Sequence, residues 1–293
     1  AFNQMKNIIE YIFIRFLIFL VAIIPFRLLY LISDCCSYLL QYVIKYRHIV
    51  VVENLINSFP EKNIDEIKLL TNKFYKTLSD TILESLKGYS SDSKLLLRRY
   101  QFLNPEISNK YFEEGRDVII ALSHYCNWEW GTQVSSLFLK HELISFYKPM
   151  SNKYSDSYFL KKRMKLNMKL LSIYYPKFNL RSKGGKPRAY FFINDQRPKD
   201  GRKVIKTYFL NQKTACMRGL EDFAKLLNLP VIYADIQKVK RGFYTVQMEQ
   251  ICSNPSETLP GEITEKYMRK LETIINKKPE DWLWSHRRWK FKY

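Results

Sequence analysis

The residues Val118–Leu122 form a five-residue apolar run, and the first three of them are β-branched. Such a run is typical of a strand whose two faces are both buried, as in a parallel sheet covered by helices. An amphipathic stretch follows from about Trp128 to Leu139. His124 and Glu129 therefore lie where a predicted strand gives way to a helix. In open α/β sheets, ligands bind at that end of the strands.

The spacing of His124 and Glu129 limits how these two side chains can meet. On an ideal helix five residues turn through about 500°, which leaves the side chains roughly 140° apart. A contact requires His124 to lie in the turn before the helix, with the chain folding back. Glu129 would then fix the imidazole tautomer, and the other ring nitrogen could take a proton from a hydroxyl. The alternative is that His124 only caps or packs against the helix start, and the spacing is compatible with both.

Composition favours a folded protein with an anionic partner. The 293 residues suffice for one large α/β domain or two small ones, and a hydrophobic content of 46% excludes disorder. The formal charge of +20 favours nucleic acid, anionic lipid surfaces or acidic proteins as partners. The five cysteines form no C-x-x-C pair, which indicates a reducing compartment and argues against structural zinc.

The N-terminal segment Ile8–Ile32 is almost entirely apolar. Glu10, Arg15 and Arg27 interrupt it, and the 11 residues between the two arginines fall short of the roughly 20 that cross a bilayer. We expect residues 5–45 to form a membrane anchor that either spans or lies in one leaflet, with a weaker amphipathic helix over residues 33–45 along the interface. A buried helix of a soluble core is the alternative. Residues 46–293 would form the main domain.

Predicted strands and helices alternate along that domain. Asn63 begins a long helix with Glu66 placed for a capping box, and Gly88 ends it. Glu84, in its later half, is expected to be a solvated or paired surface group. Further strands are predicted at Leu143–Phe146, Ala189–Ile193 and Pro230–Ile236, helices at Thr214–Leu227 and Ile263–Ile275, and a late antiparallel pair at Gly242–Met248 and Gln250-Ile251. The order predicts an α/β fold with a mostly parallel central sheet flanked by helices.

A strongly polarised stretch runs from Ser157 to Asn194, which contains no acidic residue. It could form a phosphate-binding wall, or a docking face for an acidic carrier protein or anionic headgroups. A solvated amphipathic helix is the alternative. The one-sided charge favours an anionic partner. The ten cations are Lys161, Lys162, Arg163, Lys165, Lys169, Lys177, Arg181, Lys183, Lys186 and Arg188.

Several blocks together resemble the bacterial lipid A late acyltransferases, the lauroyl and myristoyl transferases of the lysophospholipid acyltransferase superfamily. These blocks are SHYCNWEW, NDQ, TACMRGLEDFAKLLNLPV and PEDWLWSHRRWK, preceded by RHIVVVENLINSFPEKN. They occur in the family's order from about Ile8 to Lys290. The resemblance implies a glycerolipid-acyltransferase-like fold with an N-terminal hydrophobic helix.

The resemblance also implies an activity. A fatty acyl group would pass from acyl carrier protein to a hydroxyl of a lipid A precursor, at the cytoplasmic face of the bacterial inner membrane and among anionic lipids. Acyl carrier protein would be a co-substrate, with no other cofactor, no metal and no nucleic acid involved. His124 would be the general base and Glu129 its partner, where many relatives have Asp. The residues expected at the substrates are Asn127, Lys148, Arg163, Asp195, Gln196 and Arg197.

The sequence is also compatible with other functions. The same pair could act on a phospholipid or aminolipid acceptor, or the chain could be a basic nucleic-acid- or lipid-binding protein without activity. A covalent intermediate on Ser123 or Cys126 is disfavoured because no nucleophile elbow surrounds either residue. The segment His286-Arg287-Arg288 fits a second site, and the tryptophans around it, Trp282, Trp284 and Trp289, suit a membrane-interface belt. The alternative is a tail packed against the domain.

Overall fold

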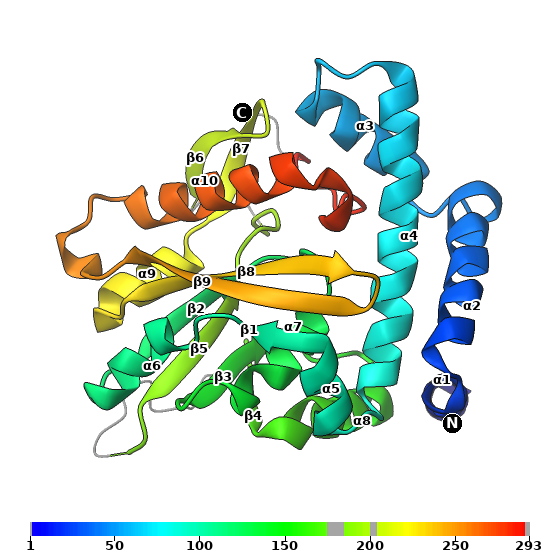
Figure 1. Ribbon diagram of the computed structural model, residues 1–293, viewed down its shortest axis with the longest axis horizontal. Coiled ribbons are helices and arrows are strands. Elements are labelled where there is room, and N and C mark those ends of the chain that lie inside the picture. The colour runs from blue at the N-terminus through cyan, green and yellow to red at the C-terminus, as the bar shows by residue number, and fades with distance from the viewer. Residues whose placement is uncertain (1, 175–184, 200–203, 291–293) are drawn as a thin grey trace.

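The computed structural model describes residues 2–174, 185–199 and 204–290, built around a sheet of seven strands in the order β1-β9-β8-β2-β5-β3-β4 (Figure 1). Five of the six neighbouring pairs are parallel, and only β8 and β9 pair antiparallel. The predicted mostly parallel sheet flanked by helices is confirmed. The strands are β1 (Tyr100–Phe102), β2 (Val118–Leu122), β3 (Glu142–Tyr147), β4 (Met168–Ser172), β5 (Arg188–Ile193), β8 (Val231–Lys240) and β9 (Phe243–Cys252).

Strand β2 lies in the middle of the sheet between β8 and β5, and all five of its residues are buried. Its unbroken apolar sequence suits this position because no face of the strand meets water. In Figure 1, α10 lies above strands β8 and β9, whereas α5 and α6 lie below them. The helices around the sheet are α3 (His48–Ser58), α4 (Ile64–Gly88), α5 (Ser93–Arg99), α6 (Glu106–Glu113), α7 (Trp128–Val134), α8 (Lys153–Arg163), α9 (Gly219–Leu227) and α10 (Glu262–Lys277).

The helix predicted at Thr214–Leu227 is wrong in its first part. Residues Val204–Phe209 and Gln212–Met217 form a separate antiparallel hairpin, β6 and β7, and α9 begins only at Gly219. The two residues of the hairpin turn, Leu210 and Asn211, have φ values of 48° and 62°. A two-residue turn with both φ values positive matches the twist of a hairpin and sets its register.

The polarised stretch after Ser157 is not one amphipathic helix. Helix α8 ends at Arg163, a short 3₁₀ turn follows, and the chain then enters β4 at the edge of the sheet. Within the stretch, Lys177, Arg181 and Lys183 lie outside the described residues.

Glu84 on α4 is fully buried, so the expectation of a surface group is wrong. Its carboxylate accepts hydrogen bonds from the hydroxyls of Tyr30 (2.8 Å) and Tyr244 (2.7 Å) and from the amide of Asn127 (2.8 Å). Burial raises the pKa of Glu84, although these three donated hydrogen bonds act in the opposite direction. The long helix begins as predicted, with the reciprocal capping box between Asn63 and Glu66.

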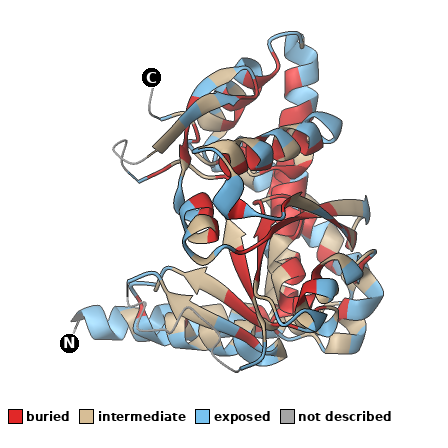
Figure 2. Cartoon of the chain, turned by 90° about the vertical axis from the view of Figure 1, so that its left-hand side faces the viewer, coloured by how far each residue is buried: buried red, intermediate tan, exposed pale blue. Residues whose placement is uncertain are grey.

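The apolar N-terminal segment forms two helices, α1 (Phe2–Ile23) and α2 (Phe26–Tyr38), followed by a π-helical turn, η1 (Leu39–Val43). Helix α1 lies along the outside of the molecule and is largely exposed (Figure 2). Over the part of the chain that the structure describes, no helix combines the length and the apolar character needed to cross a membrane. Membrane anchoring and the division of the chain at residue 45 remain predictions.

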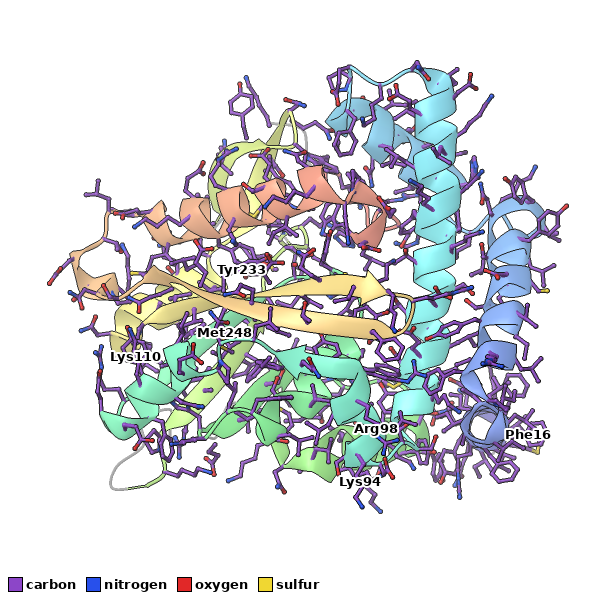
Figure 3. The ribbon with its side chains drawn as sticks, in the orientation of Figure 1. Phe16, Lys94, Arg98, Lys110, Tyr233 and Met248 are labelled. Atoms are coloured by element: carbon purple, nitrogen blue, oxygen red, sulfur yellow. The ribbon has the colours of Figure 1, made fainter. Side chains whose placement is uncertain are left out.

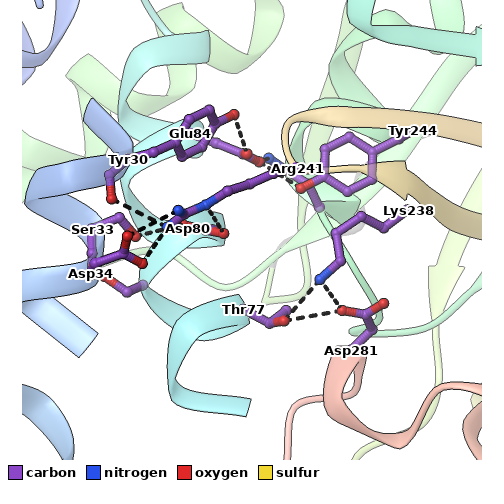
Figure 4. A network of polar contacts seen from close by, with 12 residues as sticks. Tyr30, Ser33, Asp34, Thr77, Asp80, Glu84, Lys238, Arg241, Tyr244 and Asp281 are labelled. Carbon is purple, nitrogen blue, oxygen red and sulfur yellow. Dashed lines mark hydrogen bonds and ion pairs between the residues drawn. The ribbon is translucent and has the colours of Figure 1, made fainter. Parts of the chain in front are cut away.

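A buried polar network joins the N-terminal helices to the sheet (Figure 4). The guanidinium of Arg241, at the turn between β8 and β9, pairs with Asp34 of α2 at 2.8 Å and with Asp80 of α4 at 2.7 Å. Lys238 of the same hairpin pairs with Asp281. The hairpin therefore fixes α2 and α4 on the main domain.

Candidate active site

His124 and Asp195 lie side by side at the carboxyl end of the sheet. They follow two neighbouring parallel strands, β2 and β5, in which Leu122 pairs with Ile193, so each stands two residues beyond the last pair. The Oδ1 atom of Asp195 lies 2.7 Å from Nδ1 of His124, and its Oδ2 accepts a 2.9 Å hydrogen bond from the backbone N–H of His124. The carboxylate therefore holds both the ring and the backbone of this histidine.

Asp195 is itself rigidly held. Its side chain is 1% exposed, and Oδ2 also accepts a 2.9 Å hydrogen bond from the indole N–H of Trp282. Burial alone would raise the pKa of Asp195, but the charge and hydrogen bonds of His124, together with Trp282, bring that pKa below its usual value. An ionised Asp195 requires the proton of a neutral His124 ring to lie on Nδ1, which leaves Nε2 as an acceptor.

The Nε2 atom of His124 lies 3.3 Å from the amide nitrogen of Gln196. An amide NH₂ can only donate, so this contact agrees with a ring that carries its proton on Nδ1. The DQ pair predicted to contact substrate thus places its two side chains on the two nitrogens of the imidazole.

Glu129 does not contact His124, contrary to the pairing that the sequence predicts. Its carboxylate binds the guanidinium of Arg163 at 2.6 and 3.2 Å and accepts a 3.1 Å hydrogen bond from the hydroxyl of Tyr89. The reason is geometric, because Glu129 lies in the first turn of α7 and its side chain reaches α8, whereas His124 turns toward β5. The place predicted for Glu129 at the ring is occupied by Asp195.

The turn between β2 and α7 explains this separation. Cys126 has a φ of 52°, a left-handed conformation that is rare for a residue with a side chain. Asn127 then caps α7, its side chain accepting from the N–H of Trp130 at 3.0 Å and donating to Glu84. Asn127 is fully buried, so the structure gives it a role in positioning this turn and not the substrate contact that was expected.

His124 and Glu129 line the same pocket, which has a volume of about 220 Å³. Two cations that were predicted to contact substrate, Lys148 and Arg163, line this pocket together with His124. Lys148 is exposed at the rim. The remaining lining is mixed, with Trp128, Thr132, Gln133, Ser145, Phe146, Tyr147, Met168, Leu170 and Ile193. The pocket therefore combines apolar walls with two cationic side chains, one of which is paired with Glu129.

Other predicted residues lie behind this pocket. The backbone N–H of Arg197 donates to Nε2 of His286 at 3.2 Å. Burial lowers the pKa of His286 to about 4, so its ring is uncharged at neutral pH. Arg288 is buried and donates to Thr214 and to the backbone oxygen of Ala215. The C-terminal segment is a packed tail that supports the site.

The positive run is partly neutralised within the fold. Lys169 and Arg188 both pair with Glu142, and the ammonium of Lys165 donates to the backbone oxygen of Ser91 at 2.9 Å. Arg163, paired with Glu129, is the member of the run that lines the His124 pocket. Within the described ranges no group of three or more His, Cys, Asp or Glu side chains could hold a metal ion.

Comparison with known proteins identifies the family. A model of the bacterial lipid A biosynthesis acyltransferase family matches residues 1–291, nearly the whole chain. A comparison with curated proteins found none that matches. The family match agrees with the blocks noted in the sequence, and His124 lies within one of them. The chain therefore belongs to the bacterial lipid A biosynthesis acyltransferases, and it is an acyltransferase of lipid A synthesis.

Proposed function

We propose that this enzyme moves a fatty acyl group from acyl carrier protein to a hydroxyl of a lipid A precursor, at the cytoplasmic face of the bacterial inner membrane. The observation that carries the proposal is the His124 ring, bonded through Nδ1 to the buried Asp195 and lining a pocket with two cations. An imidazole held in this way is suited to take a proton from an alcohol.

The reaction proceeds by direct transfer. The acceptor hydroxyl replaces the Gln196 amide at Nε2 of His124, which takes the hydroxyl proton as the oxygen attacks the thioester carbonyl carbon. The carbon–sulfur bond then breaks, and the imidazolium returns the proton to the leaving thiolate, giving an ester and a free thiol. Asp195 stabilises the imidazolium between these steps, as an ionised partner does for other catalytic histidines. No cofactor takes part.

The two nucleophilic side chains near His124 support direct transfer over a covalent intermediate. Ser123 is 3% exposed and its hydroxyl lies 3.1 Å from that of Tyr233. Cys126 is 1% exposed, and burial raises the pKa of its thiol well above the usual value. The thiolate is the reactive form of cysteine, and burial disfavours it.

The exposed side of α1 supports association with the membrane. Ile9, Ile12, Phe13, Phe16 and Phe19 are each at least 55% exposed. Figure 3 shows Phe16 on α1 at the same end of the molecule as Lys94 and Arg98 of α5. Apolar side chains flanked by cations suit the boundary between acyl chains and anionic headgroups.

A transfer assay tests the proposal. We expect the purified protein to increase the mass of a lipid A precursor by one fatty acyl group when acyl carrier protein supplies the thioester, as followed by mass spectrometry. His124→Ala is the control that should form no product on the same timescale. Product on a phospholipid or aminolipid but not on the lipid A precursor would support the alternative acceptor. Failure with every acceptor, from a folded protein, would refute the proposal.

Glu129→Gln tests whether Glu129 serves the pocket and not the imidazole. The change removes the charge that holds Arg163. We therefore expect the KM for the substrate bound in this pocket to rise about tenfold, which corresponds to the loss of roughly one charge-assisted hydrogen bond. The pH profile of kcat should be unchanged because Asp195 still holds His124. Glu142→Gln removes the same charge at β3 outside the pocket and is the matched control. If the pH profile of kcat shifted in Glu129→Gln but not in Glu142→Gln, Glu129 would act on the His124 ring as the sequence predicts.

A further inference from the structure

A second pocket, whose lining does not include Glu129, adjoins His124 through two of its wall residues. It has a volume of about 310 Å³, and two of its lining residues contact His124 directly. The amide of Gln196 lies at Nε2 of the ring, and the N–H of Leu283 donates to the backbone oxygen of His124 at 3.1 Å. The other lining residues are Leu40, Tyr46, Arg47, Leu78, Ile82, Ser285 and His286.

The walls of this second pocket suit an apolar chain. Leu40 of η1, Leu78 and Ile82 of α4, and Leu283 of the C-terminal segment supply aliphatic surface. The titratable wall residues are Tyr46, Arg47 and His286, and burial lowers the pKa of His286 to about 4, so its ring is uncharged at neutral pH. The volume corresponds to about ten groups of the size of a water molecule, at about 30 Å³ each. It can therefore hold a substantial part of a fatty chain.

The pocket also borders a group of exposed apolar side chains in η1 and directly after it. Leu40 belongs to η1. In the same turn and directly after it, Tyr42, Val43 and Ile44 are each at least 48% exposed. Arg47, a pocket residue, is exposed as well. Exposed apolar side chains with a cation beside them are the surroundings that an amphiphile with an anionic headgroup would meet on leaving a bilayer.

The backbone beside the pocket is strained. Lys45 and Arg47 both have a φ of 51°, although neither is glycine, and they follow directly on the π-helical turn. The conformation is held by the hydroxyl of Tyr75, which donates to the backbone oxygen of Tyr46 at 2.7 Å, and by Arg47, which donates to that of Ser285 at 2.9 Å. Strained residues and π-turns that the surrounding contacts maintain cluster at functional sites.

We propose that this second pocket binds the hydroxylated fatty chain of the acceptor lipid, so that its hydroxyl reaches Nε2 of His124 from the side of Gln196. The inference deepens the proposed function and rests on it. The first pocket, with Lys148 and Arg163 at its rim, then receives the thioester end of the donor. The two substrates approach the imidazole from opposite sides of Gln196, and its side chain moves aside when the hydroxyl arrives.

Filling the second pocket tests the assignment. Ile82, on α4, is 45% exposed, so Ile82→Trp can fill the pocket with little cost to the core. We expect kcat/KM for a full-length acceptor to fall about tenfold or more, as a blocked chain subsite requires. For an acceptor whose hydroxylated chain is shortened by several carbons, kcat/KM of Ile82→Trp should stay within about twofold of the wild-type value. The KM for the donor should also stay within about twofold. Leu69→Trp, at a 54% exposed position of the same helix outside the pocket, is the matched control.

Two outcomes would overturn the assignment. If Ile82→Trp raised the KM for the donor and left kcat/KM for the acceptor unchanged, the pocket would bind the donor chain instead. If Ile82→Trp and Leu69→Trp had the same kinetic constants, the pocket would bind neither chain. A binding measurement separates this inference from the proposed function. The probe is a phosphorylated glucosamine lipid whose 3-hydroxyacyl chain carries bromine near its end. Quenching of the native tryptophans by this probe should report the same Kd for wild type and Leu69→Trp and about tenfold weaker binding to Ile82→Trp, even if no transfer is detected.

Discussion

Asp195→Asn is expected to lower kcat by about 10⁴-fold, nearly as much as His124→Ala. The Oδ2 position accepts two N–H groups, from the His124 backbone and from Trp282, so the amide oxygen of Asn must take that place. Its NH₂ group then faces Nδ1 of His124 and forces the ring proton onto Nε2. The variant would keep its geometry and lose the acceptor nitrogen.

Two measurements check this prediction. Steady-state turnover should show the loss in kcat, and nitrogen chemical shifts of labelled histidine should show the proton moving from Nδ1 to Nε2. Asp222→Asn, which alters an exposed ion pair with Arg218, is the control and should leave both unchanged. If Asp195→Asn retained more than a tenth of the wild-type kcat, Asp195 would not be the partner that orients the base.

Glu84→Ala is expected to destabilise the fold by about 3–5 kcal/mol, because three buried polar groups would each lose a partner at about 1–3 kcal/mol. These groups are the hydroxyls of Tyr30 and Tyr244 and the amide of Asn127. Urea denaturation measures the loss. Glu61→Ala removes the same charge at an exposed site before α4 and should change stability by less than about 0.5 kcal/mol.

The pH dependence of this effect has a defined sign. Burial raises the pKa of Glu84, so the folded protein binds this proton more tightly than the unfolded chain does. The stabilisation from that proton is complete below the ordinary value of 4.5 and is lost as pH rises through the raised pKa. The difference in stability between wild type and Glu84→Ala should be wider at pH 5 than at pH 8. An equal or narrower difference at pH 5 would contradict the raised pKa.

The sequence predicts the sheet and the place of His124 at the end of β2, but the carboxylate that contacts its ring is Asp195 and not Glu129. Apolar runs identify β2 and β5, and the sequence places His124 just after the first and Asp195 just after the second. What a single sequence does not show is that β2 and β5 are neighbours in register, since two strands and the segments between them separate these two along the chain. With that pairing known, equal offsets from Leu122 and Ile193 would have brought His124 and Asp195 together.

Two further differences are the strand β4, which has a local signal in the sequence, and the burial of Glu84, which has none. Leu166, Met168 and Leu170 alternate with polar residues at a period of two, which is the pattern of a strand and was available as a signal for β4. The buried position of Glu84 had no such signal. It depends on Tyr30 and Tyr244, which are 54 and 160 residues away along the chain and approach it only in the folded protein.

The network around Arg241 bears on how shorter versions of this enzyme would behave. Asp34 and Tyr30 come from α2, whereas Asp80, Glu84 and Arg241 belong to the body that they brace. Cutting away the first 45 residues to avoid detergent would leave Arg241 with one carboxylate in place of two and deprive Glu84 of a donor. A truncated protein would thus lose one of the two carboxylates that pair with Arg241 and one of the three donors to Glu84, and its fold would be less stable than that of the full chain.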